Sequence, residues 1–240
     1  DDVWGDDEDI IYLTGDTWNY DNDILEVRAG TIILVAALQN DQKEGAMTPQ
    51  MIDDLANAYV TDPYPGGLCQ SLLYSNWNRT SWLHISGTMM ARGNDLVPVI
   101  ITSDSNENRS YDFKGIWLYN GIFDYCFYTN SQVFCCWPNT LIAHCVLTNH
   151  LESGRNGSGW AVANYFGDAH NECEDMGGEQ SNNHVAFYNV FEQHWSNAIT
   201  LHDNAIVELR FNSFIGTGGV GTLSNTTADS RLTLRGNSIP

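Results

Sequence analysis

Histidine and carboxylate side chains are concentrated between residues 150 and 203, where the sequence has more groups able to do chemistry than elsewhere. A histidine beside a carboxylate can act as an acid or a base, and paired carboxylates can cleave a glycosidic bond. The best candidates for such a catalytic set are Asp168, His202 and Asp203. The alternative is a long solvated loop that covers one face of the fold and has no catalytic role.

A short acidic run in the same stretch offers ligands for a metal ion. Glu172, Glu174 and Asp175 lie close together in the sequence, and carboxylate oxygens are the ligands that Ca²⁺ prefers. No His-x-Glu-x-x-His spacing or other tight set of zinc ligands is present. We therefore expect no obligatory cofactor, and Ca²⁺ is the ion that these residues suit best.

The sequence suggests two kinds of covalent modification, disulfide bonds and glycosylation. The six cysteines form no CxxC pair, and Cys69 and Cys173 are the best candidates for disulfides, with Cys135 or Cys136 as partners. The full set of disulfide candidates is Cys69, Cys126, Cys135, Cys136, Cys145 and Cys173. Glycosylation sequons occur at Asn78, Asn108, Asn156 and Asn225. These features favour a secreted or cell-surface protein.

Short strands must position these groups. From residue 10 onward, apolar and polar residues alternate over four to six positions, as in 24–28 and 114–118, and glycine, asparagine, aspartate and serine separate the runs. Residues 1–9 form an acidic lead-in before this pattern begins. We therefore predict an all-β domain over 10–240.

Two segments interrupt the strand pattern. At 48–59 a capping threonine is followed by proline, and Met51, Leu55 and Tyr59 share one helical face. This pattern predicts an insertion at about 40–76 with one short helix. A second insertion is predicted at about 150–183.

A weak internal repeat indicates how the strands are arranged. Residues 207–214 and 232–239 place apolar residues at the same offsets around Asn212 and Asn237, and 185–191 is a looser copy around Asn189. Two further copies have Cys126 and Cys145 in place of the asparagine. The intervals from 126 to 145, 189, 212 and 237 are 19, 44, 23 and 25 residues, and 159–164 supplies the copy missing from the longest one. A period near 22 residues without a helix in each repeat predicts stacked β-coils.

The repeated asparagines have a structural role in such a stack. An inward asparagine at each turn can hydrogen bond to its equivalents in the coils above and below. We therefore expect Asn189, Asn212 and Asn237 to form a buried ladder. Cys126 and Cys145 would occupy the same slot in neighbouring coils, either as packed thiols or as a bonded pair.

The sequence resembles the right-handed parallel β-helix (pectate-lyase-like) superfamily, in particular its secreted repeat proteins. The residues that carry the resemblance are Thr17, Trp18, Asp21, Asp23, 27–31, 85–93, 98–103, Gly115 and Ile116. The resemblance implies a single right-handed parallel β-helix of about eight or nine coils. It does not imply one activity, because this fold hosts lyases, hydrolases, adhesins and structural proteins.

Charge limits the partners that the chain can have. With 30 acidic and 10 basic residues the net charge is −20, so nucleic acid is disfavoured. No apolar run is long enough for a membrane span. Two function classes remain. The favoured one is a non-catalytic extracellular structural or surface protein, which self-associates end to end or binds glycans. The alternative is a carbohydrate-active enzyme, a polysaccharide lyase or glycoside hydrolase, with its site on the face flanked by 150–203.

The two ends of the predicted solenoid differ. Residues 232–239 form a full repeat close to Pro240, whereas the acidic lead-in could shield the first coil. An uncovered last coil would pair with other chains. We therefore expect this coil to be covered, either by a second subunit stacked end-on or by further polypeptide.

Overall fold

The structure is a computed structural model. It describes residues 2–5, 10–62, 67–107, 109–157, 159–169, 172–176, 184–192, 198–202, 205–216, 221–224 and 231–238. Within these ranges the side chains of 152–157, 168–169, 172–176, 202 and 221–224 are outside the description.

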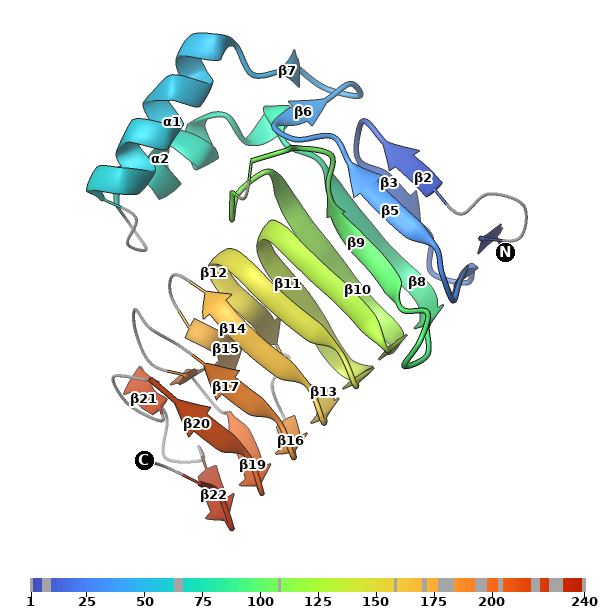
Figure 1. The fold of residues 1–240 in the computed structure, drawn as a ribbon, viewed down its shortest axis with the longest axis vertical. Helices are drawn as coiled ribbons and strands as arrows, with labels where there is room; N and C mark the ends of the chain where they lie inside the picture. Colours follow the sequence, from blue (N-terminus) through green and yellow to red (C-terminus); the bar gives the residue numbers. More distant parts are fainter. Residues whose placement is uncertain are drawn as a thin grey trace.

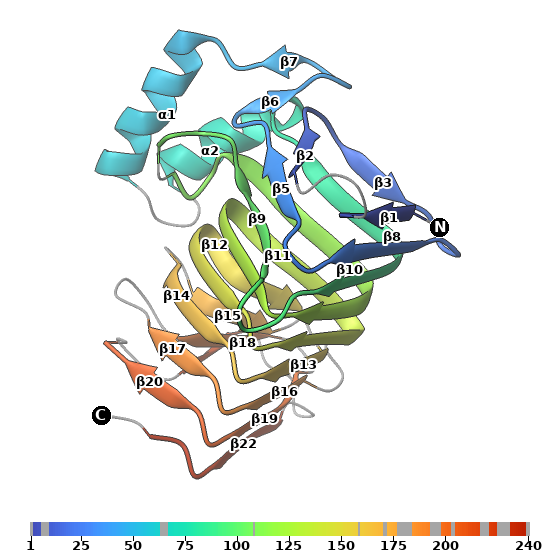
Figure 2. The same cartoon turned by 45° about the vertical axis from the view of Figure 1, so that its right-hand side comes forward.

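The chain winds into stacked coils whose strands pair in parallel with those of the coils before and after (Figures 1 and 2). The pairing forms three faces, which we name sheets A, B and C. Sheet A consists, in the described residues, of β1 (Asp2–Trp4), β4 (Ile24–Arg28), β8 (Trp82–Arg92), β10 (Phe113–Asp124), β11 (Cys126–Ala143), β13 (Gly159–Val162), β16 (His184–Phe187), β19 (Ile206–Arg210) and β22 (Arg231–Arg235).

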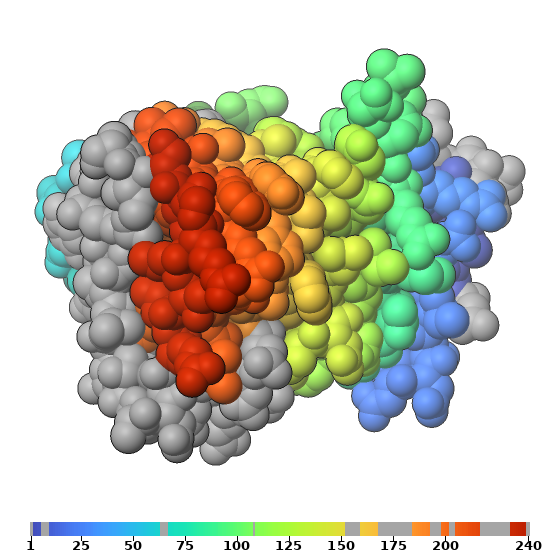
Figure 3. Space-filling model, turned by 90° about the horizontal axis from the view of Figure 1, so that it is seen from below, coloured from blue at the N-terminus to red at the C-terminus, as the bar shows by residue number. Residues whose placement is uncertain are grey.

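The other two faces are built in the same way. Sheet B consists of β2 (Ile10–Leu13), β5 (Ile32–Val35), β9 (Val99–Ser103), β11, β12 (Val146–Gly157), β14 (Tyr165–Ala169), β17 (Val190–Glu192) and β20 (Ser213–Ile215). Sheet C consists of β3 (Thr17–Asn19), β8, β10, β11, β12, β15 (Glu172–Met176), β18 (Ile199–His202) and β21 (Gly221–Ser224). The predicted fold class, an all-β parallel β-helix, is confirmed. The view from below shows the coils as colour bands in chain order (Figure 3).

Long strands bend so that one strand belongs to two sheets. The first part of β8 pairs with β3 in sheet C and the second part with β4 in sheet A. Gly87 lies between the two parts, and a Cβ atom there would come within 2.2 Å of the Tyr20 carbonyl oxygen. The bend therefore requires glycine at this position.

Alternate residues of each strand fill the interior. In sheet B the inward row contains Phe166, Phe191 and Phe214, whose rings stack at 5.2 and 5.1 Å between centroids. These rings are almost fully buried. The period-two alternation of the sequence thus gives each coil its buried face.

One type of turn, between sheets A and B, recurs from coil to coil. A residue with positive φ is followed at once by an inward ladder residue, as at Tyr188–Asn189 and Phe211–Asn212. The Asn212 Oδ1 accepts from the backbone N–H of Asn189 at 2.8 Å and from its Nδ2 at 3.0 Å. Asn237 accepts from Asn212 in the same way, and Asn189 from Asn164. The structure therefore places the three predicted asparagines, and Asn164, in one column.

Cysteines continue this column toward the N-terminus. The Cys145 backbone N–H donates to Asn164 Oδ1 at 2.8 Å, and the Cys126 backbone N–H donates to Cys145 Sγ at 3.3 Å. Both cysteines are buried and carry free thiols. The sulfur atom therefore replaces the amide oxygen as the acceptor for the neighbouring coil.

A helical insertion lies beside sheets B and C at one edge of the stack (Figure 1). It contains a small antiparallel pair, β6 (Gln39–Asn40) and β7 (Gly45–Ala46), then α1 (Pro49–Thr61), α2 (Leu68–Ser75) and the 3₁₀ turn η1 (Trp77–Arg79). Thr48 caps α1 as predicted, since its side chain accepts from the Met51 N–H. Neither α1 nor α2, the α-helices of the described residues, is long and apolar enough to cross a membrane.

The prediction of one helix in this insertion is corrected to two. Cys69 and Leu73 lie one helical turn apart in α2 and are buried in a cluster with Leu55 and Ala58 of α1. The second helix is only eight residues long and begins at Gly67 without a side-chain cap. Such a short amphipathic segment is stabilised by packing rather than by its own sequence signals.

Two predicted boundaries are also corrected. Residues 150–183 are not an insertion in their described part, because β12, β13, β14 and β15 continue all three sheets through this range. The acidic lead-in at 1–9 is not wholly outside the solenoid, because β1 pairs with β4 as the first strand of sheet A. Polar sequence misled the prediction in both places, since parallel backbone pairing does not require an apolar outer face.

Candidate functional site

The side chains that the sequence analysis favoured for catalysis lie outside the part of the molecule that the structure describes. Asp168 lies in β14 and His202 in β18, but their side chains are outside the description, and Asp203 lies outside the described residues. The side chains of the three calcium candidates, Glu172, Glu174 and Asp175 of β15, are also outside it. The described residues contain no cluster of three or more metal-ligating side chains.

The cysteines differ from the prediction of disulfides. Cys69 is a free thiol on the buried side of α2, where burial raises its pKa to about 12. Cys126 and Cys145 are the thiols that continue the asparagine column, as described above. Cys136 is buried and Cys135 half-buried in β11, and the side chain of Cys173 is not described. The disulfide prediction for Cys69 is therefore wrong, and of the two alternatives for Cys126 and Cys145 the structure shows packed, hydrogen-bonding thiols.

The sequons have different positions. Asn78 is exposed in η1, and its Nδ2 donates to Glu44 Oε1 at 3.0 Å. Asn156 lies inside β12 rather than in a predicted loop, and its side chain is not described. Asn108 and Asn225 lie outside the described residues.

An aromatic surface is the most distinctive feature of the outside of the coils. It lies on the outer face of sheet C, at the N-terminal half of the stack, and extends onto η1. We call it the aromatic ladder, and it consists of Trp18, Trp77, Trp82, His84, Trp117, Tyr119 and Trp137.

The register of the sheet aligns these rings. Trp18, His84 and Trp117 are paired positions in β3, β8 and β10. Trp18 stacks on His84 with ring centroids 4.4 Å apart, and Tyr119 stacks on Trp137 at 4.1 Å. Because parallel strands in successive coils are about 4.8 Å apart, equivalent outward side chains must stack when they are aromatic. The ladder is therefore continuous over the coils that contain it.

The ladder is partly open to solvent. Trp18, at the outer end of its row, is 47% exposed, and the other members are half-buried. Aromatic rings in an exposed row are a surface for a ligand that has apolar faces and polar edges, since the ring faces are apolar and the indole N–H groups can donate hydrogen bonds. The ladder therefore has the composition of a binding surface.

A buried carboxylate, that of Asp16, connects the strand that carries Trp82 to the helical insertion. Asp16 Oδ1 accepts from the Trp82 backbone N–H at 3.1 Å and from Asn40 Nδ2 at 2.9 Å, and its Oδ2 pairs with Lys43 Nζ at 2.7 Å. Its side chain is 1% exposed. Both oxygens are thus engaged in fixing β8 against the insertion, which makes Asp16 a positioning residue.

The second lysine of the chain also lies under the ladder. Lys114 is buried, and its Nζ lies 4.5 Å from the ring centroid of Trp77 and 5.6 Å from that of Trp82. Burial and then the charge of Lys43 lower its pKa to about 8, although Asp16 acts in the opposite direction. This cation–π arrangement fixes the two indoles relative to the sheet.

His84 is the polar ring inside the ladder. Burial lowers its pKa, so the imidazole is neutral at pH 7, although Asp16 acts in the opposite direction. Its Nδ1 has no hydrogen-bond partner within the described residues. A neutral imidazole between tryptophans can accept or donate a hydrogen bond to a hydroxyl group.

Sequence analysis identified the strands that carry the ladder but not the ladder itself. The outward positions Trp82 and His84, Trp117 and Tyr119, and Cys135 and Trp137 each alternate with buried residues in their strand. The signal was therefore the recurrence of outward aromatic residues in successive coils. It was missed because the register between coils cannot be read from the sequence alone, and for Trp18 it also depends on the length of the insertion.

Comparison with protein-family models, curated proteins and solved structures finds no match to this chain.

Proposed function

We propose that this protein is a non-catalytic extracellular β-helix that binds neutral glycans through the aromatic ladder. The observation that supports the proposal is the continuous stack of rings from Trp18 to Trp137 on an outer sheet face. Sugar rings have apolar C–H faces and hydroxyl edges, and tryptophan and tyrosine complement both. The net charge of −20 favours uncharged glycans over acidic ones.

We also propose that the chain belongs to the pectate-lyase-like superfamily and acts outside the cell. The parallel coils and the asparagine ladder support the family assignment, and the exposed sequon at Asn78 is compatible with a secreted glycoprotein. On this proposal no metal is needed, and Ca²⁺ would have only a structural role near 172–175.

Affinity electrophoresis in gels that contain soluble neutral polysaccharides tests the glycan proposal. We expect slower migration of the full chain in at least one polysaccharide, and Trp18→Ala and Trp137→Ala should each weaken the affinity about tenfold, or 1.4 kcal/mol. Trp160→Ala is the matched control, because Trp160 is similarly exposed, at 49%, but lies on sheet A. Unchanged migration in every polysaccharide would contradict the proposal.

One observation favours the enzymatic alternative. Lys114 combines a lowered pKa of about 8 with a place beneath the ladder, and an amine of this kind can act as a base. If the protein were a polysaccharide lyase, incubation with a polysaccharide panel would release unsaturated products, and Lys114→Met would abolish them. If it were a hydrolase, reducing ends would appear instead. A binding protein without enzymatic activity would release neither unsaturated products nor reducing ends, and it would still migrate more slowly in the polysaccharide gel.

A further inference from the structure

The outer face of sheet A has a composition that differs from the rest of this acidic protein. Its outward positions include Arg28, Arg92, Arg210, Arg231 and Arg235. These are half of the ten cationic residues of the chain. The outward carboxylates described on the face are Glu26, Asp124 and Glu208. Among the described residues of this face, arginines therefore outnumber carboxylates by five to three, in a chain whose net charge is −20.

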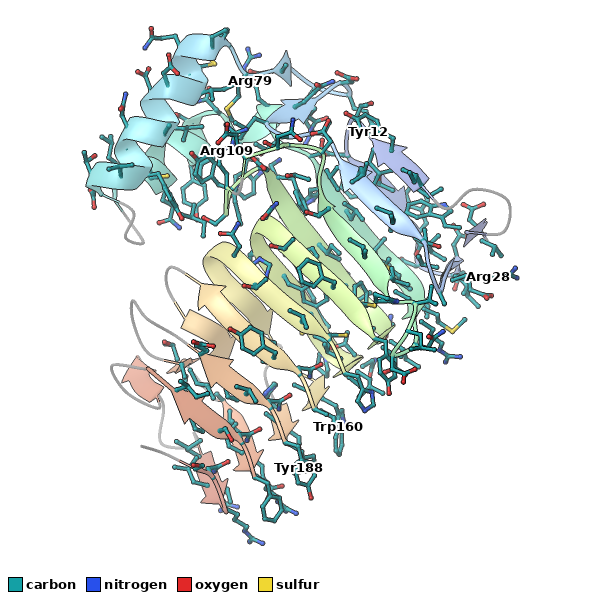
Figure 4. The ribbon with its side chains drawn as sticks, viewed as in Figure 1. Tyr12, Arg28, Arg79, Arg109, Trp160 and Tyr188 are labelled. Carbon is teal, nitrogen blue, oxygen red and sulfur yellow. The ribbon has the colours of Figure 1, made fainter. Side chains whose placement is uncertain are left out.

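The centre of the same face is apolar. One outward row runs across adjacent strands through Met90, Ile122, Leu141, Trp160 and Val185. Trp160 is 49% exposed, and Figure 4 shows it projecting from the margin of the stack along which Arg28 also lies. Parallel sheets normally have both faces covered, and a contiguous apolar strip on a soluble protein marks an interaction site.

The row itself ends at Glu26 and Glu208, and the arginines lie one outward position to the side of it at both ends, where each end has a hollow. At one end Arg28 and Arg92 are paired positions in β4 and β8 and line a pocket of about 470 Å³ with Glu26 and Met90. At the other, a pocket of about 300 Å³ is lined by residues that include Glu208, Arg231 and Arg235. Arg28 faces Arg92, and Arg210 faces Arg235, at paired positions of the sheet, where like charges repel each other. An anion beside Arg92 or Arg235 would relieve this repulsion.

Existing partners neutralise two of these five arginines. Arg28 pairs with Glu26 and Arg210 with Glu208. Asp124, at the position paired with Arg92, is instead bonded to His144 Nδ1 at 2.9 Å. Arg92, Arg231 and Arg235 have no ion pair to another described residue. The guanidinium group forms bidentate bonds to carboxylates.

We propose that the outer face of sheet A docks a partner protein whose contact surface is apolar at its centre and carries carboxylates at both ends. Six strand spacings separate Arg92 in β8 from Arg235 in β22, so the two acidic groups of the partner would be about 29 Å apart. An interface rich in arginine, methionine and aromatic residues and without lysine has the composition of known protein contacts. Distant acidic groups of the chain do not prevent such docking, because charges beyond about 8 Å are screened at physiological salt.

A synthetic peptide tests this proposal on the full chain. The probe is a 13-residue peptide with three aspartates at each end and seven apolar or threonine residues between, labelled for fluorescence anisotropy. We expect it to bind at 50 mM NaCl and to weaken at least tenfold at 500 mM. The double variant Arg92→Gln/Arg235→Gln and the single variant Trp160→Ser should each weaken binding at least tenfold, whereas Trp18→Ala should change it less than twofold.

The controls distinguish an acidic partner protein from other molecules that could bind this face. A peptide with asparagine in place of aspartate should bind at least tenfold more weakly. The proposal is overturned if the aspartate peptide does not bind at 50 mM NaCl, or if Trp160→Ser leaves its affinity unchanged. It is also overturned if a sulfated oligosaccharide competes as well as the peptide does. Sedimentation velocity showing that the chain self-associates through Trp160 would assign the face to a second copy instead.

Discussion

Replacement of Asn212 by leucine should destabilise the coils on either side, because this side chain connects three of them. Asn212 Oδ1 accepts from the N–H and the Nδ2 of Asn189, while its Nδ2 donates to the Ala186 carbonyl at 3.0 Å and to Asn237 Oδ1 at 3.1 Å. Asn212 is 1% exposed, so water cannot replace these bonds.

The expected cost follows from the groups that lose a partner. Leucine leaves the Asn189 N–H and the Ala186 carbonyl without their Asn212 partners, and an unsatisfied buried group costs about 1–3 kcal/mol. Asn189 Nδ2 keeps its bond to the Ala161 carbonyl at 3.0 Å and loses less. The free energy of unfolding should therefore fall by about 2–6 kcal/mol.

Two matched variants show whether hydrogen bonding is the cause. Asn212→Cys should cost about half as much as leucine, because Cys145 Sγ already accepts a backbone N–H in the same column. Asn139→Leu removes an exposed amide bond to Asn120 and should cost less than about 0.5 kcal/mol.

Denaturant unfolding followed by tryptophan fluorescence measures the three variants, and hydrogen exchange locates the loss in β16 and β19. Hydrogen exchange is needed because stacked repeats can unfold in stages. A leucine variant as stable as the cysteine variant would refute the hydrogen-bond explanation of the ladder.

Three further predictions concern pH and the surface. His150 is fully buried, and burial lowers its pKa to about 3, so the unfolded chain gains a proton below pH 6.5 that the folded chain does not. Between pH 6.5 and 3 the contribution of this group to stability should therefore fall by about 1.4 kcal/mol per pH unit on acidification, and His150→Gln should remove that contribution in denaturant titrations. Burial raises the pKa of Asp112 to about 6, so acidification from pH 6 to 4 should add stability through this group, and titrations of Asp112→Asn should lack that gain. Leu232 and Leu234 are inward positions of the last described coil, yet they are 37% and 45% exposed. If the chain stacks end-on, light scattering should show association that Leu232→Lys abolishes. A monomer whose mass does not change with concentration would count against stacking.

The sequence was sufficient to predict the coils because each one repeats the same local pattern. Apolar alternation determines which face of a strand is buried, and the asparagine after each turn marks the position in the coil. Asn164 shows the strength of this reasoning, since 159–164 was predicted as a coil although its strand is only four residues long. Properties that depend on one coil at a time could therefore be predicted.

Properties that depend on contacts between coils were harder to predict. The aromatic ladder requires Trp18 to pair with His84, 66 positions later, and this register follows from the size of the helical insertion. The choice between a disulfide and packed thiols at Cys126 and Cys145 stayed open, because two cysteines in adjacent coils look the same in sequence in both cases. The two ends of the outer face of sheet A could not be related for the same reason, since its arginines come from strands far apart in the chain.

Indole resonances of the eight tryptophans test the central claim most directly. In a two-dimensional ¹H–¹⁵N spectrum each indole N–H gives a separate signal, which single substitutions assign. We predict that a neutral glycan selected by affinity electrophoresis shifts the signals of Trp18, Trp117 and Trp137 and leaves that of Trp160 unchanged. A shift confined to Trp160, or shifts of no indole at all, would contradict the assignment of glycan binding to the aromatic ladder.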